Sequence, residues 1–71
     1  MKKISINDTY ITLGQMLKLT NMFNSGGHIK VFLQDEGVLV NEEQENRRGR
    51  KLYNGDTIQL PSGDQFIIVQ Q

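Results

Sequence analysis

The sequence predicts an α+β fold in which two helices pack on one face of a small, mainly antiparallel β-sheet. Apolar residues recur at helical spacing in only one region, residues 13–33. Short stretches of β-type composition lie before and after that region. The expected order is therefore strand, helix, helix and then a run of strands, within one domain that covers residues 1–71.

The first part of the chain is expected to form a strand and a helix. Residues 3–6 ("KISI") alternate and suit a short strand, and a second extended piece begins at Tyr10–Ile11. Thr12 and Gln15 have the spacing of a capping box, which marks the start of a helix. The helix carries one stripe at i, i+3, i+4 and i+7, formed by Leu13, Met16, Leu17 and Thr20.

A second helix is expected from about Gly27 to Glu36, and Gly37 is a natural C-terminal stop. One face of this helix carries Ile29, Phe32 and Leu33. Val31 lies off that face and is expected to be partly buried. The residues assigned to the core include all of the phenylalanines: Phe23, Phe32 and Phe66.

Three β-type stretches follow: 38–41 ("VLVN"), 56–60 ("DTIQL") and 65–70 ("QFIIVQ"). The segments between them are predicted to be turns. The acidic residues between the first two stretches, Glu42, Glu43 and Glu45, are expected on a solvated edge.

The composition argues against catalysis and metal binding. The chain has no cysteine and one histidine, which excludes a cysteine-ligated zinc, a histidine-rich metal site and a hydrolytic triad. It has no phosphate loop, dinucleotide fingerprint or nucleophile elbow. We therefore expect a binding module that is not an enzyme, with no cofactor and no small-molecule substrate. The apolar runs are too short for a bilayer and no signal peptide is evident, so a cytoplasmic protein is expected. The small size and mild apolar content suit a monomer.

Charge is strongly segregated along a chain that is formally neutral, with eight basic and eight acidic residues. The stretch "NRRGRKL" holds half of the cations: Arg47, Arg48, Arg50 and Lys51. No acid occurs from Thr9 to Gln34, where Lys18, His28 and Lys30 are found. One interpretation is a basic face that binds a polyanion. The other is a solvated loop whose arginines pair with the glutamates at 42, 43 and 45.

The stretch "ITLGQMLKLTNMFNSGGHIKVFLQDEGVLVNEE" and the later "GDTI" resemble the RNA-binding domain named after small-subunit ribosomal protein S-four, also called the alpha-L motif. The similarity covers about residues 11–60 and is greatest to the small stand-alone bacterial version, the YaaA type, with "SGG" and "RRGRKL". The matching positions are Ser25, Gly37, Val38, Val40, Asn41, Gly55, Asp56 and Ile58.

Two departures from the family pattern are visible. Gly26 and Gly27 stand where many members carry arginines, so side-chain contacts to phosphate are lost there. Glu42 replaces the glycine that usually follows the asparagine, so the turn at Asn41–Glu42 is expected to be of a different or longer type.

The resemblance implies a protein that binds structured RNA through its two helices and the basic loop. The implied partner is ribosomal RNA or a ribosomal subunit undergoing assembly, with tRNA second. The RNA-facing residues would be Ser25, Gly26, Gly27, Lys30, Arg47, Arg48, Arg50 and Lys51, with Lys18 as an addition.

Physical chemistry gives these residues distinct roles. The amides of Gly26, Gly27 and His28 are free of helical partners, so the helix start can hold a phosphate, while Ser25 can simply be its N-cap. Arginine presents a planar fork to phosphate. Replacing the three arginines at 47, 48 and 50 by alanine is expected to weaken RNA binding without affecting the fold.

Other assignments and alternatives complete the prediction. Tyr53 is assigned to packing, Asn41 to a turn and His28 to the helix start. A β-grasp-like protein-interaction module without RNA affinity is the main alternative; a sulfur carrier of that class needs a C-terminal Gly-Gly, whereas this sequence ends "IIVQQ". DNA binding is disfavoured because neither helix places several base-reading side chains on one exposed face.

Overall fold

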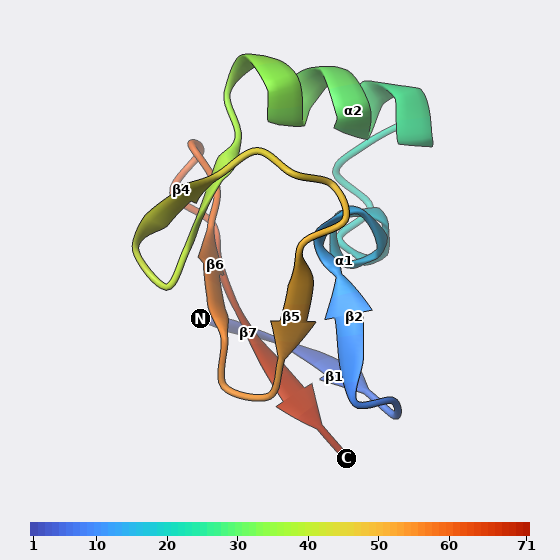
Figure 1. The fold of residues 1–71 in the computed structure, drawn as a ribbon, viewed down its shortest axis with the longest axis vertical. Helices are drawn as coiled ribbons and strands as arrows, with labels where there is room; N and C mark the ends of the chain where they lie inside the picture. Colours follow the sequence, from blue (N-terminus) through green and yellow to red (C-terminus); the bar gives the residue numbers. More distant parts are fainter.

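The computed structural model describes residues 1–71, with two strands before two helices and five strands after them (Figure 1). The elements are β1 (Lys2–Ile6), β2 (Tyr10–Thr12), α1 (Leu13–Leu19), α2 (Gly26–Asp35), β3 (Val38–Val40), β4 (Glu43–Glu45), β5 (Lys51–Tyr53), β6 (Thr57–Gln59) and β7 (Gln65–Gln70).

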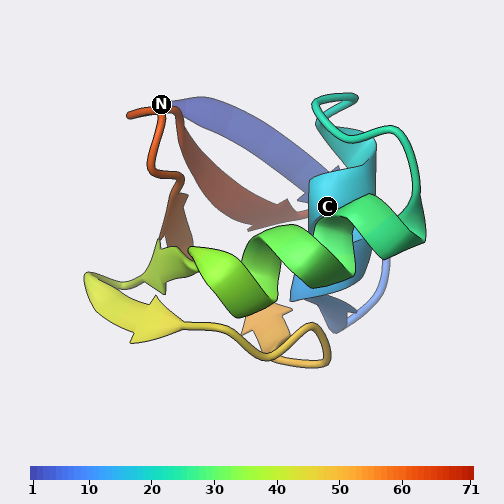
Figure 2. The same ribbon diagram turned by 90° about the horizontal axis from the view of Figure 1, so that it is seen from above.

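The strands form a five-stranded sheet in the order β1-β7-β6-β3-β4 and a two-stranded sheet of β2 and β5. Every pair is antiparallel except β1–β7, which is parallel and joins the two ends of the chain. Helix α2 lies at one end of the molecule, and α1 lies beneath it near the middle and runs across its direction (Figures 1 and 2). The predicted α+β class is confirmed.

Helix α1 begins as predicted. The Thr12 amide donates to Gln15 Oε1 over 3.1 Å, and the Gln15 amide donates to Thr12 Oγ1 over 3.3 Å. This capping box satisfies amides that the first helical turn leaves free. The apolar positions of the predicted stripe, Leu13, Met16 and Leu17, are buried, and Thr20 is the half-buried C-cap.

Helix α2 begins at Gly26 and ends at Asp35, one residue earlier at each end than predicted. Gly37 has φ +75°, the left-handed conformation that ends helices and that glycine adopts without strain. The expectation for Val31 was wrong, because its side chain lies on the solvent face of the helix. Neither helix has the length and apolar character that crossing a membrane requires.

Two of the strands were not predicted. Residues 42–55 were expected to form turns, but β4 ("EQE") pairs with β3, and β5 ("KLY") pairs with β2. These three-residue segments lack the alternation of β-branched residues that marks a strand in sequence. Their pairing partners, and not their own propensity, hold them extended.

The turn between β3 and β4 is tighter than expected. Val40 pairs directly with Glu43, so only Asn41 and Glu42 lie between the strands. Both have positive φ, 50° and 70°, as in the tightest hairpin turns. The prediction of a different or longer turn was therefore wrong. Asn41 acts as a turn residue, because its side chain accepts from the Thr57 amide and donates to Asp56.

The core lies between the helices and the two sheets and contains 13 buried apolar residues. Phe66 belongs to it, as predicted, whereas Phe23 and Phe32 are half-buried and pack against its edge. Leu52 is fully buried and is the β5 residue that ties the two-stranded sheet to this core.

Replacing Leu52 by alanine is expected to lower the free energy of unfolding by about 2–5 kcal/mol, because a fully buried leucine leaves a cavity. Urea denaturation measures the change. Leu19→Ala is the matched control, since Leu19 is exposed at the end of α1 and its loss should change stability by less than about 0.5 kcal/mol. Equal losses in the two variants would contradict the central position of β5.

Candidate nucleic-acid interface

The basic stretch forms a loop between β4 and β5, which we call the arginine loop (residues 46–50). The Arg48 carbonyl accepts from the Gly14 amide over 2.9 Å, and the Arg50 carbonyl accepts from the Leu13 amide over 2.8 Å. Leu13 and Gly14 open α1, where amides have no partner inside the helix. The arginine loop is therefore fastened by its backbone to the start of α1.

Glu45, the last residue of β4, organises this loop from its base. It is only 6% exposed, and its carboxylate accepts five hydrogen bonds. Two come from the amides of Asn46 and Arg47, at 3.1 and 3.0 Å. Two more come from the Arg47 guanidinium, both at 3.1 Å, and one from Arg50 Nη1 at 2.9 Å.

This environment keeps Glu45 ionised. Hydrogen bonds from the Arg47 side chain lower its pKa most, and further bonds from the Arg47 amide and from Arg50 act in the same direction. Burial opposes them, since it disfavours a charged carboxylate. The net result is a pKa of about 2 instead of the ordinary 4.5. The carboxylate also raises the pKa of Arg47.

The acidic residues of this hairpin do not all lie on a solvated edge. Glu42 and Glu43 are exposed, but the expectation was wrong for Glu45. The register does not explain the difference, because Glu43 and Glu45 both lie opposite buried valines, Val40 and Val38. Glu45 is the one that meets the arginine loop, whose Asn46 and Arg47 amides and Arg50 guanidinium donate to its carboxylate. Both ion pairs in the structure involve Glu45, so the proposed pairing of the loop with Glu42 and Glu43 does not occur.

Arg47 and Arg50 consequently support the fold as well as carrying charge. Removing both would leave a buried carboxylate without its cations, which is a costly state. The triple alanine variant at 47, 48 and 50, expected from sequence to leave the fold unaffected, is therefore now predicted to be less stable than wild type. Arg47 still exposes 75% of its side chain, so a face of its guanidinium remains open to a ligand.

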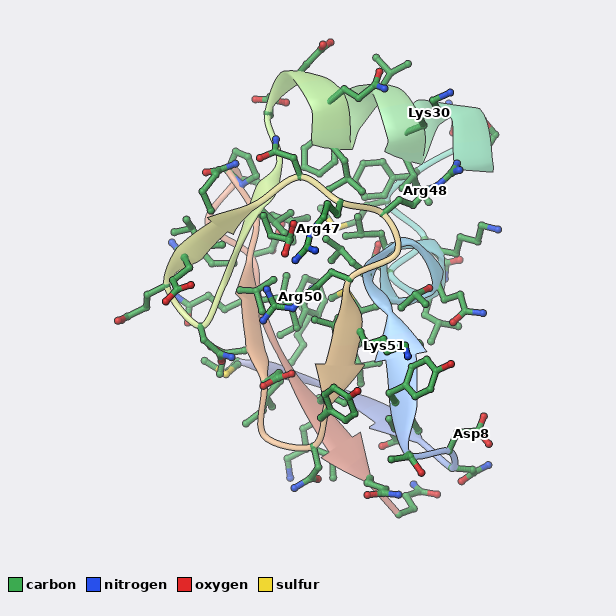
Figure 3. All side chains as sticks on the ribbon, viewed as in Figure 1. Asp8, Lys30, Arg47, Arg48, Arg50 and Lys51 are labelled. Atoms are coloured by element: carbon green, nitrogen blue, oxygen red, sulfur yellow. The ribbon has the colours of Figure 1, made fainter.

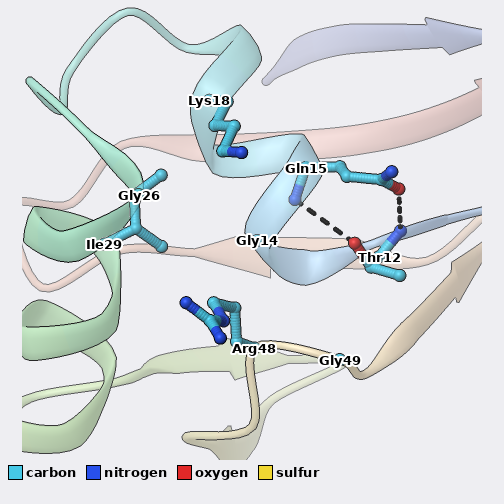
Figure 4. Close-up of a pocket in the computed structure, with 8 residues that line it drawn as sticks. All are labelled: Thr12, Gly14, Gln15, Lys18, Gly26, Ile29, Arg48 and Gly49. Atoms are coloured by element: carbon cyan, nitrogen blue, oxygen red, sulfur yellow. Dashed lines mark hydrogen bonds between the residues drawn. The ribbon is translucent and has the colours of Figure 1, made fainter.

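Arg48 has a different setting, because its side chain forms no hydrogen bond or ion pair within the protein. It lines a pocket of about 240 Å³ where the arginine loop meets both helices (Figure 4). Lys18 of α1 lies on the opposite side, and Gly26 lies between them at the start of α2 (Figure 4). The remaining lining residues are Thr12, Gly14, Gln15, Ile29 and Gly49.

Gly14 lets the loop approach α1 closely. A Cβ at this position would lie 2.5 Å from Arg48 Cγ, which is shorter than the distance that two non-bonded carbon atoms allow. The absent side chain therefore leaves the space that the base of the Arg48 side chain occupies. Sequence inspection did not single out Gly14, since a contact 34 positions away along the chain leaves no local signal.

The start of α2, where Gly26 lines the pocket, has open amides. The amides of Gly26 and Gly27 donate to no protein acceptor, whereas the His28 amide donates to Ser25 Oγ over 3.2 Å. Ser25 is the N-cap, one of the two roles expected for it, and it occupies the His28 amide, which has no partner within the helix. A Cβ on Gly26 would lie 4.0 Å from Lys18 Nζ, which places this ammonium beside the helix start.

His28 and Asn24 complete this turn. The Asn24 amide donates to His28 Nδ1 over 3.2 Å, and the imidazole packs edge-on against Phe23. The assignment of His28 to the helix start agrees with these contacts.

The other predicted cations extend the surface on either side of the pocket. Lys30 is exposed on α2, one turn from its start, and Lys51 is exposed on β5 (Figure 3). In this view the labelled cations lie between α2 and β5, while Asp8 lies apart near the β1–β2 turn. Lys18, considered from sequence only as an addition, is the lysine that shares a pocket with Arg48.

Replacing Glu45 by glutamine is expected to lower the free energy of unfolding by about 1–3 kcal/mol, because charged hydrogen bonds to both arginines are lost. Urea denaturation at pH 7 measures the loss. Glu43→Gln makes the same charge change at an exposed position of the same strand and should be nearly neutral. A Glu45→Gln variant as stable as Glu43→Gln would contradict the organising role of Glu45.

The same carboxylate predicts how stability depends on pH. The pKa of Glu45 is lower in the folded protein than the ordinary 4.5, so its contribution is fully present above that pH. Stability should fall as the pH drops from 4.5 towards 2, where the folded carboxylate takes up its proton. Unfolding measured over this range should show a smaller decline in Glu45→Gln. An equal decline in both proteins would refute the assignment.

Comparison with known proteins places these features in a family. A model of the S4 domain matches residues 4–69, which extends beyond the resemblance expected over 11–60. The chain is 52% identical over 66 residues to the probable ribosome maturation protein RlbA of Bacillus subtilis (strain 168), and the match covers 93% of each chain. No solved structure gives a significant match. With its predicted family supported by both comparisons, the chain belongs to the S4 domain family.

Proposed function

We propose that this protein is a non-catalytic RNA-binding protein that acts on ribosomal RNA, or on a ribosomal subunit, during ribosome maturation. Membership of the S4 domain family and the similarity to the probable ribosome maturation protein of Bacillus subtilis support the ribosomal role. The observation that carries the RNA-binding part is the pocket in which unpaired Arg48, Lys18 and the open start of α2 converge.

The chemistry of this pocket suits a phosphate group. Arg48 supplies a planar fork of donors, and Lys18 supplies a compact positive charge. The free amides of Gly26 and Gly27 point outward from the positive end of the α2 dipole. A Cβ at either glycine would meet only ordinary van der Waals contacts, so packing within the protein does not require glycine at these positions.

The proposed contact surface extends from this pocket in both directions. Lys30 and Lys51 would add point charges, and Arg47 would add its exposed guanidinium edge. Arg50 would contribute less to RNA binding than the other cations. It is already paired with Glu45, and its side chain is less exposed than that of Arg47, the other paired arginine. The full proposed set is Lys18, Ser25, Gly26, Gly27, Lys30, Arg47, Arg48, Arg50 and Lys51.

Such a surface would read the backbone and shape of RNA. A-form helices present phosphates and 2′-hydroxyls to proteins while their deep groove hides the bases. A compact cluster of cations and amides matches phosphates better than it matches base edges. We propose ribosomal RNA as the partner, with tRNA second, and a monomer of one domain acting in the cytoplasm.

Sedimentation of the tagged protein through sucrose gradients of cell extract tests the proposal. Migration with a ribosomal subunit or its precursor at low salt, and release at high salt, is the expected result. If about four phosphates are contacted, log affinity should fall with log salt at a slope of roughly −3 to −4. Protein that stays at the top of the gradient at every salt concentration would contradict a ribosomal partner.

The double variant Lys18→Ala/Arg48→Ala locates the contact. This variant should bind the ribosomal particle more weakly than wild type. The slope of log affinity against log salt should become less steep by roughly two, since each lost phosphate contact lowers its magnitude by about one. Its stability should stay close to wild type, because neither side chain is paired within the protein. Lys2→Ala/Lys3→Ala, which removes two exposed cations from β1, is the charge-matched control. Equal slopes in the two variants would show that overall charge, and not the pocket, governs binding.

A further inference from the structure

We propose that the groove beside Tyr10 takes an unpaired nucleobase of the RNA whose backbone lies on Lys18 and Arg48. The proposal rests on the RNA-binding function proposed above and adds a second kind of contact to it. The function itself requires only phosphate contacts, whereas the groove would let the protein prefer RNA with a single-stranded segment next to a helix.

The groove has a volume of about 520 Å³ and lies between the β1–β2 turn and α1. Tyr10, Ile11 and Leu19 supply apolar surface, and Asn7 and Gln15 supply polar side chains. A flat nucleobase requires this combination, because its faces are apolar enough to stack and its edges form hydrogen bonds. The side-chain oxygen of Gln15 is occupied by the Thr12 amide, while its Nε2 donates to no protein atom.

The groove adjoins the phosphate pocket, since Gln15 and Lys18 line both. These two side chains thus mark the place where an RNA strand on the pocket would reach the groove. Asp8, in the β1–β2 turn, also lines the groove, and its negative charge disfavours a phosphate beside it. This distribution of charge assigns the backbone to the Lys18 end and the uncharged base to the groove.

Tyr10 is the side chain suited to stack on the base. It is 41% exposed and belongs to no part of the buried core. Lys51 Nζ lies 4.9 Å from its ring centroid, so the ring already attracts a cation from the strand that follows the arginine loop. Aromatic rings beside cations are the elements with which proteins hold single-stranded RNA.

Tyr53 suggests another role for Tyr10, in stabilising the two-stranded sheet, and it also offers a control variant for the test. It is the direct partner of Tyr10 on β5, is 45% exposed, and its ring lies 6.0 Å from Tyr10 at 50°. A pair of tyrosines across two strands can serve only to stabilise the small sheet. Tyr53 does not line the groove, however, so a base-binding role predicts different effects for the two tyrosines.

The test compares two fluorescein-labelled RNA probes, a blunt hairpin and the same hairpin with four unpaired adenosines at either end. Wild type should bind the extended hairpin at least about fivefold more tightly, the low end of what one base stacked on an aromatic ring contributes. Tyr10→Leu should bind both probes equally. Tyr10→Phe and Tyr53→Leu should retain the preference.

Each contrary result has a separate meaning. Equal binding of both probes by wild type, or an unchanged preference in Tyr10→Leu, would overturn the groove proposal while leaving backbone recognition intact. If Tyr53→Leu also lost the preference, the two tyrosines would have only a structural role in the two-stranded sheet, and the groove proposal would again be overturned. Absence of salt-sensitive binding to either hairpin by wild type would instead refute the proposed RNA-binding function.

Discussion

The buried carboxylate of Glu45 is the interaction on which the basic surface depends. A carboxylate that is 6% exposed must be compensated, and here two loop amides and two arginines compensate it. Those hydrogen bonds fix the path of the arginine loop, whose carbonyls then reach the free amides of α1. The position of Arg48 beside Lys18 follows from that path. A negative charge at the base of the loop thus determines where a positive charge is presented.

The same interaction explains how a neutral chain can offer a basic surface. Half of the cations lie in one short stretch, but they do not act alike. Arg47 and Arg50 are paired with Glu45, and Lys51 lies over the ring of Tyr10. Arg48 has no partner and faces the open start of α2. A ligand therefore meets a few cations without protein partners at defined positions, and not a uniformly positive surface.

Local signals in the sequence predicted much of the fold. Thr12 and Gln15 marked the start of α1, and the spacing of Ile29 and Leu33 marked the buried face of α2, because both signals lie within a few residues. The strands β4 and β5 were missed because they are short and charged and depend on distant partners. Asn41–Glu42 adopts a tight turn despite lacking glycine, which local turn preferences disfavour.

The candidate site was predictable in composition but not in arrangement. The arginine run and the "SGG" segment were recognisable, and they do approach each other across the pocket lined by Arg48 and Gly26. The division of the arginines into paired and unpaired was not predictable, because it depends on how the folded loop brings Arg47 and Arg50, but not Arg48, to the Glu45 carboxylate. The close approach of Gly14 to Arg48 likewise exists only in three dimensions.

The most direct test of this account measures stability and RNA affinity together for two single variants, Arg48→Ala and Arg50→Ala. Each removes one cation from the same loop, so overall charge is matched. Arg50→Ala is predicted to lower the free energy of unfolding with a small effect on the affinity of the folded protein. Arg48→Ala is predicted to weaken RNA binding at unchanged stability. The opposite pattern, or identical effects of the two variants on both quantities, would contradict the roles assigned to Glu45 and Arg48.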